Sequence, residues 1–262
     1  MSLNLLIVEG NNPKDSEVFI RAAKATCSEN LKNIVLRLEP LSNVTIINPV
    51  NDNETKKVLE NMDQYNGIIF TGGAMRLNDM SEEIKKHINF ATNCFKHNNK
   101  ILAICWGLQV CSTAAGGKVS PGKNGAHIGI ATNVEINEDG KNNPIYKNKK
   151  LKFNTPAFNF DEVCELPKGA SLLASDKVNK NMGVYFKSGN SEVWGLQYHP
   201  DYEYWQMINL SNERMGKMIA KEYFKDEEMF KKHINFIKSE EKSLDFKNKT
   251  YEIQNWLDII KN

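Results

Sequence analysis

Short apolar runs alternate with amphipathic stretches over roughly the first 115 residues of the chain. The apolar runs have the length and continuous hydrophobicity of strands buried on both faces, and they cover residues 3–8, 44–47, 67–71 and 101–104. The amphipathic stretches have helical spacing and cover residues 13 to about 30, 54–62 and 81 to about 97. This alternation predicts right-handed crossovers and a mostly parallel sheet with helices on both faces.

The pattern changes in the second half of the chain. Short alternating segments with many turn residues favour antiparallel strands at one edge of the sheet, over residues 128–131, 134–136, 151–153, 171–174, 183–186 and 193–198. After His199 and Pro200 the spacing is helical again, with apolar stripes that begin near Met207, Met229 and Ile253. We therefore expect a helical extension at the C-terminal end.

Composition excludes several classes of protein. The 262 residues carry a formal net charge of only +2, so no global charge favours nucleic acid or a membrane surface. No run approaches the roughly 18 apolar residues that a membrane span needs. Five cysteines without C-x-x-C spacing speak against a disulfide framework and against a zinc site. We expect a cytoplasmic protein without a metal or cofactor.

The stretch K-I-L-A-I-C-W-G, which ends at Gly107, places Cys105 between a strand and a helix. The amides at a helix N-terminus favour a thiolate there, and Ala103 and Gly107 are small enough for a tight turn. This is the pattern of a nucleophile elbow. A lone cysteine is more often a buried and inert core residue, which is how we interpret Cys111.

Two further groups follow predicted strands. Gly72 and Gly73 come directly after one strand, and the carboxyl ends of parallel strands form a common rim where ligands bind. His199 ends another strand, with Asp201 two residues later. A cysteine nucleophile needs a base and a third group that orients the base, and these two residues offer both. Taken singly, the glycines could form an ordinary turn and the histidine could be structural.

The sequences T-G-G-A, I-C-W-G-L-Q and G-L-Q-Y-H-P-D occur in this order. Together they resemble the triad-type class I glutamine amidotransferases, in particular the stand-alone GMP synthase-like group. The resemblance runs from Leu5 to about Glu203. With the pattern above, it implies an α/β fold with a mostly parallel, flavodoxin-like central sheet flanked by helices and an antiparallel edge. We expect an amidotransferase domain over residues 1–204, and a helical extension packed on it over residues 205–262.

The resemblance implies a role for each matching residue. Cys105 would attack the side-chain amide of glutamine, His199 would move the protons, and Asp201 would orient the histidine. The backbone amides of Gly73 and Trp106 would hold the oxyanion, and Gln109 would bind the substrate. Asp201 stands where the family usually has glutamate, which leaves Glu203 open as an alternative third member of the triad.

The expected activity is release of ammonia from glutamine or a related γ-glutamyl compound. Because the residues after Tyr204 lack a phosphate-binding glycine loop, a separate synthetase would be the partner that accepts the ammonia. Two alternatives stay open: a partner-independent hydrolase of γ-glutamyl amides or peptides, and a non-catalytic regulatory binding module. The oligomeric state is also open, with a homodimer among the choices.

Overall fold

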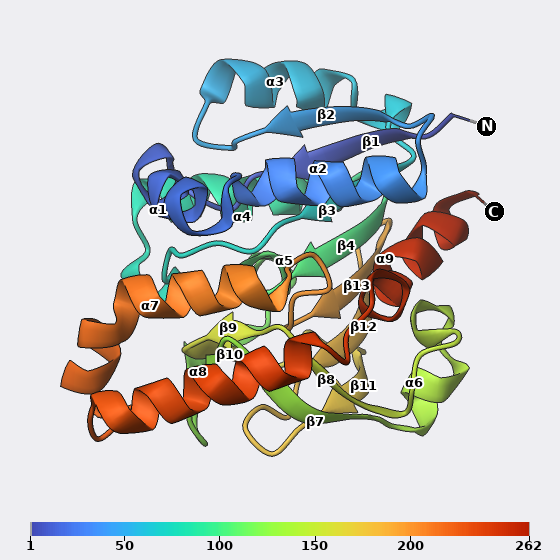
Figure 1. Cartoon of the computed structure of the whole chain (residues 1–262). Coiled ribbons are helices and arrows are strands. Elements are labelled where there is room, and N and C mark those ends of the chain that lie inside the picture. The colour runs from blue at the N-terminus through green and yellow to red at the C-terminus, as the bar shows by residue number, and fades with distance from the viewer. Residues whose placement is uncertain (1, 262) are drawn as a thin grey trace.

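A nine-stranded sheet forms the centre of the computed structural model, which describes residues 2–261 (Figure 1). In spatial order its strands are β2 (Asn43–Ile47), β1 (Asn4–Val8), β3 (Gly67–Phe70), β4 (Lys100–Ile104), β13 (Ser191–Leu196), β12 (Gly183–Ser188), β11 (Ser171–Ser175), β7 (Ala131–Ile136) and β8 (Lys152–Thr155). Neighbours from β2 to β13 are parallel, and neighbours from β13 to β8 are antiparallel. The prediction of an α/β fold with a mostly parallel sheet and an antiparallel part is confirmed.

Two small antiparallel pairs lie outside this sheet. They are β5 (Lys118–Pro121) with β10 (Asp161–Glu165), and β6 (His127–Ile128) with β9 (Phe158–Asn159). The helices are α1 (Pro13–Ala23), α2 (Cys27–Leu38), α3 (Asp52–Glu60), α4 (Glu82–Cys94), α5 (Trp106–Ala114), α6 (Glu138–Asn142), α7 (Tyr204–Ala220), α8 (Glu227–Glu241) and α9 (Phe246–Lys261). Short 3₁₀ turns are η1 (Met62–Gln64), η2 (Leu77–Asp79) and η3 (Pro144–Tyr146).

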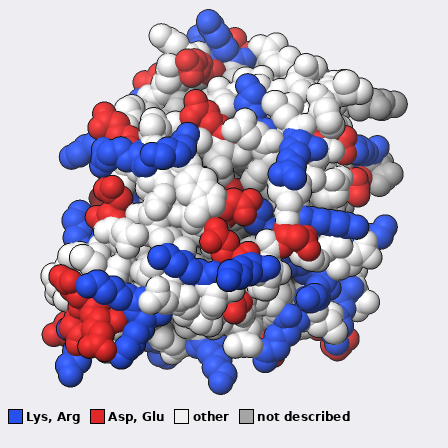
Figure 2. All heavy atoms as spheres, in the orientation of Figure 1, with Lys and Arg blue, Asp and Glu red and all other residues white. Residues whose placement is uncertain are grey.

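The two faces of the sheet have separate cores, because successive side chains of a strand point to opposite faces. Leu5 and Ile7 of β1 pack in one core with α2 and α9, while Leu6 and Val8 pack in the other with α3, α4 and α5. The parallel strands therefore have apolar side chains on both faces, as their sequence predicts. Outside these cores, basic and acidic side chains are interspersed over the face drawn in Figure 2.

The position predicted for β13 at an antiparallel edge is wrong. The strand lies in the interior of the sheet, parallel to β4 and antiparallel to β12. Its residues Val193, Trp194 and Leu196 are all buried, so the run has the continuous hydrophobicity of a central strand. The register pairs Leu196 with Ile104, and the two strands therefore end side by side.

The single helix predicted from residue 13 to about residue 30 is also wrong. Lys24 has a left-handed conformation with φ of 65°, which ends α1, and α2 begins three residues later. Thr26 and Glu29 form a capping box, in which the Thr26 hydroxyl accepts from the Glu29 amide at 3.1 Å and the Glu29 carboxylate accepts from the Thr26 amide at 2.9 Å. The break lets α1 lie against α7 while α2 packs on the sheet.

The last helix returns to the sheet instead of extending away from it (Figure 1). Trp256 and Leu257 of α9 are fully buried in the same core as β1 and α2. The Trp256 ring lies against Gly67, where an added Cβ would be 2.6 Å from the indole. A buried ion pair between Lys149 and Glu252, 2.9 Å apart, also joins α9 to the rest of the molecule. The domain boundary after residue 204 stays a prediction.

We expect Trp256→Ala to lower the free energy of unfolding by about 3–5 kcal/mol, because it removes a fully buried indole and leaves a cavity. Lys247→Ala, at an exposed position of the same helix, is the control and should change stability by less than about 0.5 kcal/mol. Urea denaturation measures both changes. A loss below about 1 kcal/mol for Trp256→Ala would contradict an integral role for α9.

Candidate active site

Cys105 lies at the sharp turn between β4 and α5, as the sequence predicts. Its φ of 51° and ψ of −106° are unusual for a residue with a side chain, and such strain commonly marks a functional position. The Cys105 amide donates to the Leu196 carbonyl at 2.6 Å, which ties the turn to the end of β13. Gly107 must be glycine here, because an added Cβ would be 2.5 Å from the Phe70 carbonyl oxygen.

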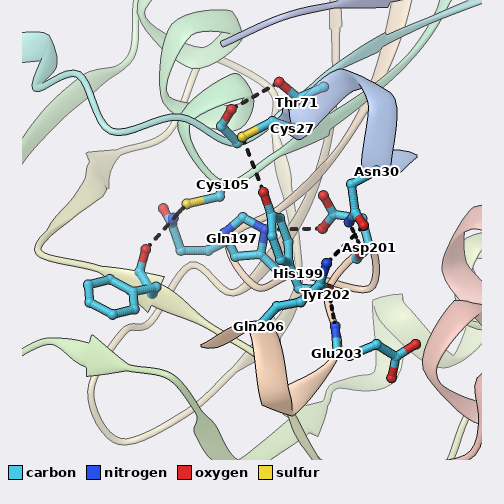
Figure 3. Close-up of polar contacts among 12 residues, drawn as sticks. Cys27, Asn30, Thr71, Cys105, Gln197, His199, Asp201, Tyr202, Glu203 and Gln206 are labelled. Carbon is cyan, nitrogen blue, oxygen red and sulfur yellow. Dashed lines mark hydrogen bonds and ion pairs between the residues drawn. The ribbon is translucent and has the colours of Figure 1, made fainter. Parts of the chain in front are cut away.

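His199 and Asp201 are paired directly after β13 (Figure 3). The Nδ1 atom of His199 lies 3.0 Å from Oδ1 of Asp201, and both side chains are buried. Tyr202 packs its ring edge-on against the imidazole at 5.0 Å between centroids, and Asn30 of α2 donates to the Asp201 carbonyl. The contact with Asp201 holds the Nδ1 side of the ring. The other ring nitrogen, Nε2, would serve the nucleophile.

Glu203 occupies a different environment from Asp201. Its carboxylate points away from the imidazole in Figure 3 and pairs with the buried ammonium of Lys249. Its backbone amide donates to the side chain of Gln206 at 2.8 Å, as part of the cap of α7. Of the two acids that the sequence left open, Asp201 is the one in contact with His199.

The electrostatics of His199 favour its protonated form. Burial by itself lowers the pKa of His199, but the charges of Cys105 and Asp201 outweigh burial and raise this pKa to about 10. Within residues 2–261, the second carboxylate oxygen of Asp201 has no hydrogen-bond partner although it is buried. The imidazolium is therefore the main compensation for the charge of Asp201.

The thiol faces a cavity of about 440 Å³. Gly73, Trp106 and Gln109 line this cavity together with Cys105. The Gly73 amide donates to no group among residues 2–261. Trp106 is the first residue of α5, so its amide has no helical carbonyl to bond. The oxyanion role of these two amides stays a prediction.

Gln109 is a buried part of this site and not a solvated helix residue. Its Nε2 donates to the Asp161 carbonyl at 2.9 Å and lies 3.4 Å from the Oε1 atom of Gln197. Gln197 in turn donates from Nε2 to the Cys105 sulfur at 3.5 Å. The sequence reasoning missed Gln197, although its place two residues before His199, in the segment that directly follows β13, is a usable signal.

Phe158 is a second contact that sequence reasoning missed. Its carbonyl oxygen lies 3.7 Å from the Cys105 sulfur, and its ring lines the cavity. No local pattern identifies it, because tertiary contacts bring it to the site: β9 pairs with β6, and the His199 amide donates to the Pro156 carbonyl at 2.8 Å. Cys111, which we interpreted as a core residue, is fully buried.

The family model of the class-I glutamine amidotransferases matches residues 25–206. Because this match covers more than half of the chain, the protein belongs to that family.

Among its relatives is the gamma-glutamyl-L-1-hydroxyisopropylamide hydrolase of a Pseudomonas species, which is 26% identical over 83% of this chain and 74% of its own length. One of the subunits of the glutamine-hydrolyzing GMP synthase of Methanococcus vannielii is 31% identical over 64% of this chain and 76% of its own length. A glutamine amidotransferase structure from Thermotoga maritima has a TM-score of 0.67 at 16% identity, and the match covers 99% of this chain and 98% of that one. This last likeness shows the fold alone.

We expect Asp201→Asn to lower turnover of a γ-glutamyl substrate by about 10²- to 10⁴-fold, because a neutral amide does not stabilise the positive charge of the imidazolium. Glu203→Gln should keep turnover per folded molecule within about threefold and lower the free energy of unfolding instead, because it leaves the buried Lys249 unpaired. Steady-state kinetics and urea denaturation of both variants separate the two effects. A large loss of turnover in Glu203→Gln, with nearly unchanged turnover in Asp201→Asn, would make Glu203 the third member of the triad.

A titration of His199 by nuclear magnetic resonance should place its pKa near 10. Cys105→Ala and Asp201→Asn should each move this pKa downward, because each removes an anion that favours the imidazolium. His199→Gln identifies the resonance. A pKa near 6.5 in the unaltered protein would contradict the charge arrangement described here.

Proposed function

We propose that the protein is a cysteine hydrolase that cleaves the γ-amide bond of glutamine or of a related γ-glutamyl compound. The Cys105 sulfur attacks the amide carbon, and the amides of Gly73 and Trp106 stabilise the oxyanion. The His199 imidazolium protonates the leaving nitrogen, so ammonia or an amine departs and a γ-glutamyl thioester remains. Water then attacks the thioester, His199 takes its proton, and glutamate leaves.

The observation that carries this proposal is the convergence on one rim of a strained cysteine, a buried histidine–carboxylate pair and two free backbone amides. Membership in the amidotransferase family supports it. The intact pair of Cys105 and His199 disfavours a non-catalytic binding module. Five free cysteines among residues 2–261 fit a reducing, cytoplasmic location. No helix within these residues has the length and hydrophobicity to cross a bilayer.

Two versions of this function differ in what happens to the nitrogen. Ammonia delivery to a separate synthetase is supported by the relatives that are subunits of the glutamine-hydrolyzing GMP synthase. Direct hydrolysis of substituted γ-glutamyl amides or peptides is supported by the Pseudomonas relative and by a gamma-glutamyl peptidase of Arabidopsis thaliana. A cavity of about 440 Å³ is in the range that holds drug-sized ligands, which favours a leaving group larger than ammonia.

We expect Cys105→Ala to lower hydrolysis of glutamine and of γ-glutamyl-p-nitroanilide by about a thousandfold or more, because it removes the nucleophile. Ammonia and nitroaniline release measure the two reactions in the purified protein. Cys164→Ala removes an exposed thiol and should leave both rates within about twofold.

Undiminished release from the Cys105→Ala variant would overturn the mechanism. Faster turnover of the anilide than of glutamine, without any added protein, would favour the partner-independent hydrolase. Glutamine turnover that appears only in a cell lysate would favour delivery of ammonia to a partner.

A further inference from the structure

Arg214 occupies the buried face of α7, where the spacing of Met207, Leu210 and Met218 predicts an apolar residue. Its side chain reaches the same cavity as Cys105. The guanidinium carbon lies 4.8 Å from the centroid of the Phe158 ring and 5.7 Å from that of Phe19. These two rings hold the guanidinium in place beside the segment that contacts the catalytic sulfur.

Arg214 has no anionic partner within the described part of the chain. No hydrogen bond or ion pair is made by its guanidinium there, and burial lowers its pKa. Taking an arginine out of water without pairing it costs free energy. A carboxylate in the cavity would offset that cost, and a guanidinium binds a carboxylate through two parallel hydrogen bonds.

Asp15 of α1 faces the same cavity across from Arg214. The two helices run in opposite directions, since Gln206 and Asn209 near the start of α7 donate to Ala23 and Ala22 at the end of α1. The start of α1 therefore lies beside the second half of α7. Among residues 2–261, the Asp15 carboxylate forms no ion pair or hydrogen bond. Its negative charge raises the pKa of Arg214, against the larger effect of burial.

The other charged residues around the cavity are less suited to hold a ligand at the sulfur. Arg76 is already paired with Asp161 through two hydrogen bonds. The rest are exposed side chains, namely Arg21, Glu213, Lys217 and Lys221. Arg214 and Asp15 are thus the partly buried, unpaired cation and anion that share the cavity with the nucleophile.

We propose that Arg214 and Asp15 hold the two charged groups of a γ-glutamyl head, with Arg214 on the α-carboxylate and Asp15 on the α-ammonium. This inference rests on the proposed function and narrows its substrates to compounds whose glutamyl α-carboxylate and α-amino group are both free. Glutamine, γ-glutamyl amides and γ-glutamyl peptides share that head. We call Arg214 and Asp15 together the clamp. Recognition of the glutamyl head leaves the amine side of the scissile bond free to vary. The clamp is therefore a specificity element and takes no part in proton transfer.

Three anilides that share one leaving group test the assignment. γ-Glutamyl-p-nitroanilide carries both charged groups, glutaryl-p-nitroanilide lacks the ammonium, and 4-aminobutyryl-p-nitroanilide lacks the carboxylate. Arg214→Gln should lower kcat/KM about 10- to 100-fold for the two anilides with the carboxylate and leave the third unchanged, because a charge-assisted hydrogen bond is lost only in those two. Asp15→Asn should lower kcat/KM for the two anilides with the ammonium and leave the glutaryl anilide unchanged.

Arg21→Gln is the matched control, because it removes an exposed arginine from the rim of the same cavity and should change all three values by less than about twofold. Equal losses on all three anilides in Arg214→Gln would indicate a merely structural role and overturn the proposal. An unchanged kcat/KM for all three anilides would also overturn the proposal. Arg214 would then lie on the leaving-group side of the cavity, where nitroaniline offers no carboxylate for it to bind.

Binding to the Cys105→Ala variant keeps this test separate from the proposed chemistry. Calorimetry should show that L-glutamate binds more tightly than glutarate or 4-aminobutanoate. The added Arg214→Gln change should weaken binding only of the two ligands with the corresponding carboxylate, L-glutamate and glutarate. If the unaltered protein hydrolyses no anilide but this binding pattern holds, the hydrolase proposal fails and the clamp stands. If Cys105→Ala binds none of the three ligands, the clamp is wrong.

Discussion

The parallel pairing of β4 with β13 is the constraint on which the site depends. It places residues about 90 positions apart in the sequence at neighbouring strand ends, with Leu196 opposite Ile104. The hydrogen bond from the Cys105 amide to the Leu196 carbonyl then fixes the turn at the end of β4 to the end of β13. A shift of one residue in this register would turn the side chains of β13 to the other face of the sheet. The hydrophobic cores on both faces therefore also fix the position of His199.

The second constraint is charge buried around the imidazole. Asp201 has one carboxylate oxygen on His199 and a second with no partner among residues 2–261, so its negative charge depends on the imidazolium. Such a pair is costly to bury, which explains why neighbouring elements hold it so closely. Asn30 binds the Asp201 backbone from α2, and Tyr202 covers the ring. Aspartate has a shorter side chain than the glutamate that the family usually has at this position. Asp201 still reaches His199, because its backbone is held close to the imidazole by the hydrogen bond from Asn30.

Sequence patterns predicted the parts of the site that local chemistry determines. Cys105 stands out because a strand changes to helical spacing around it, and His199 with Asp201 follows a strand directly. The place of β13 could not be predicted, because its partner is far away in the sequence and its own run suits either an edge or an interior position. Gln197 has a usable signal in its place two residues before His199, but its hydrogen bond to the Cys105 sulfur comes from the tertiary fold. The break before α2 is different, since Thr26 and Glu29 have the spacing of a capping box that the sequence shows openly.

Because of the break between α1 and α2, two different parts of the fold form the two walls of the cavity. The sheet positions the Cys105 thiol, the His199 imidazole and the amides of Gly73 and Trp106, all of which follow the ends of parallel strands on one rim. The opposite wall of the cavity comes from α1 and α7, which pack on each other through side chains that bond the last carbonyls of α1. Because α1 ends at Ala23, it can follow α7 instead of the sheet. In the proposed function, chemistry and substrate selection therefore rest on separate elements, and the helical wall can change its side chains without disturbing the strand ends that hold Cys105.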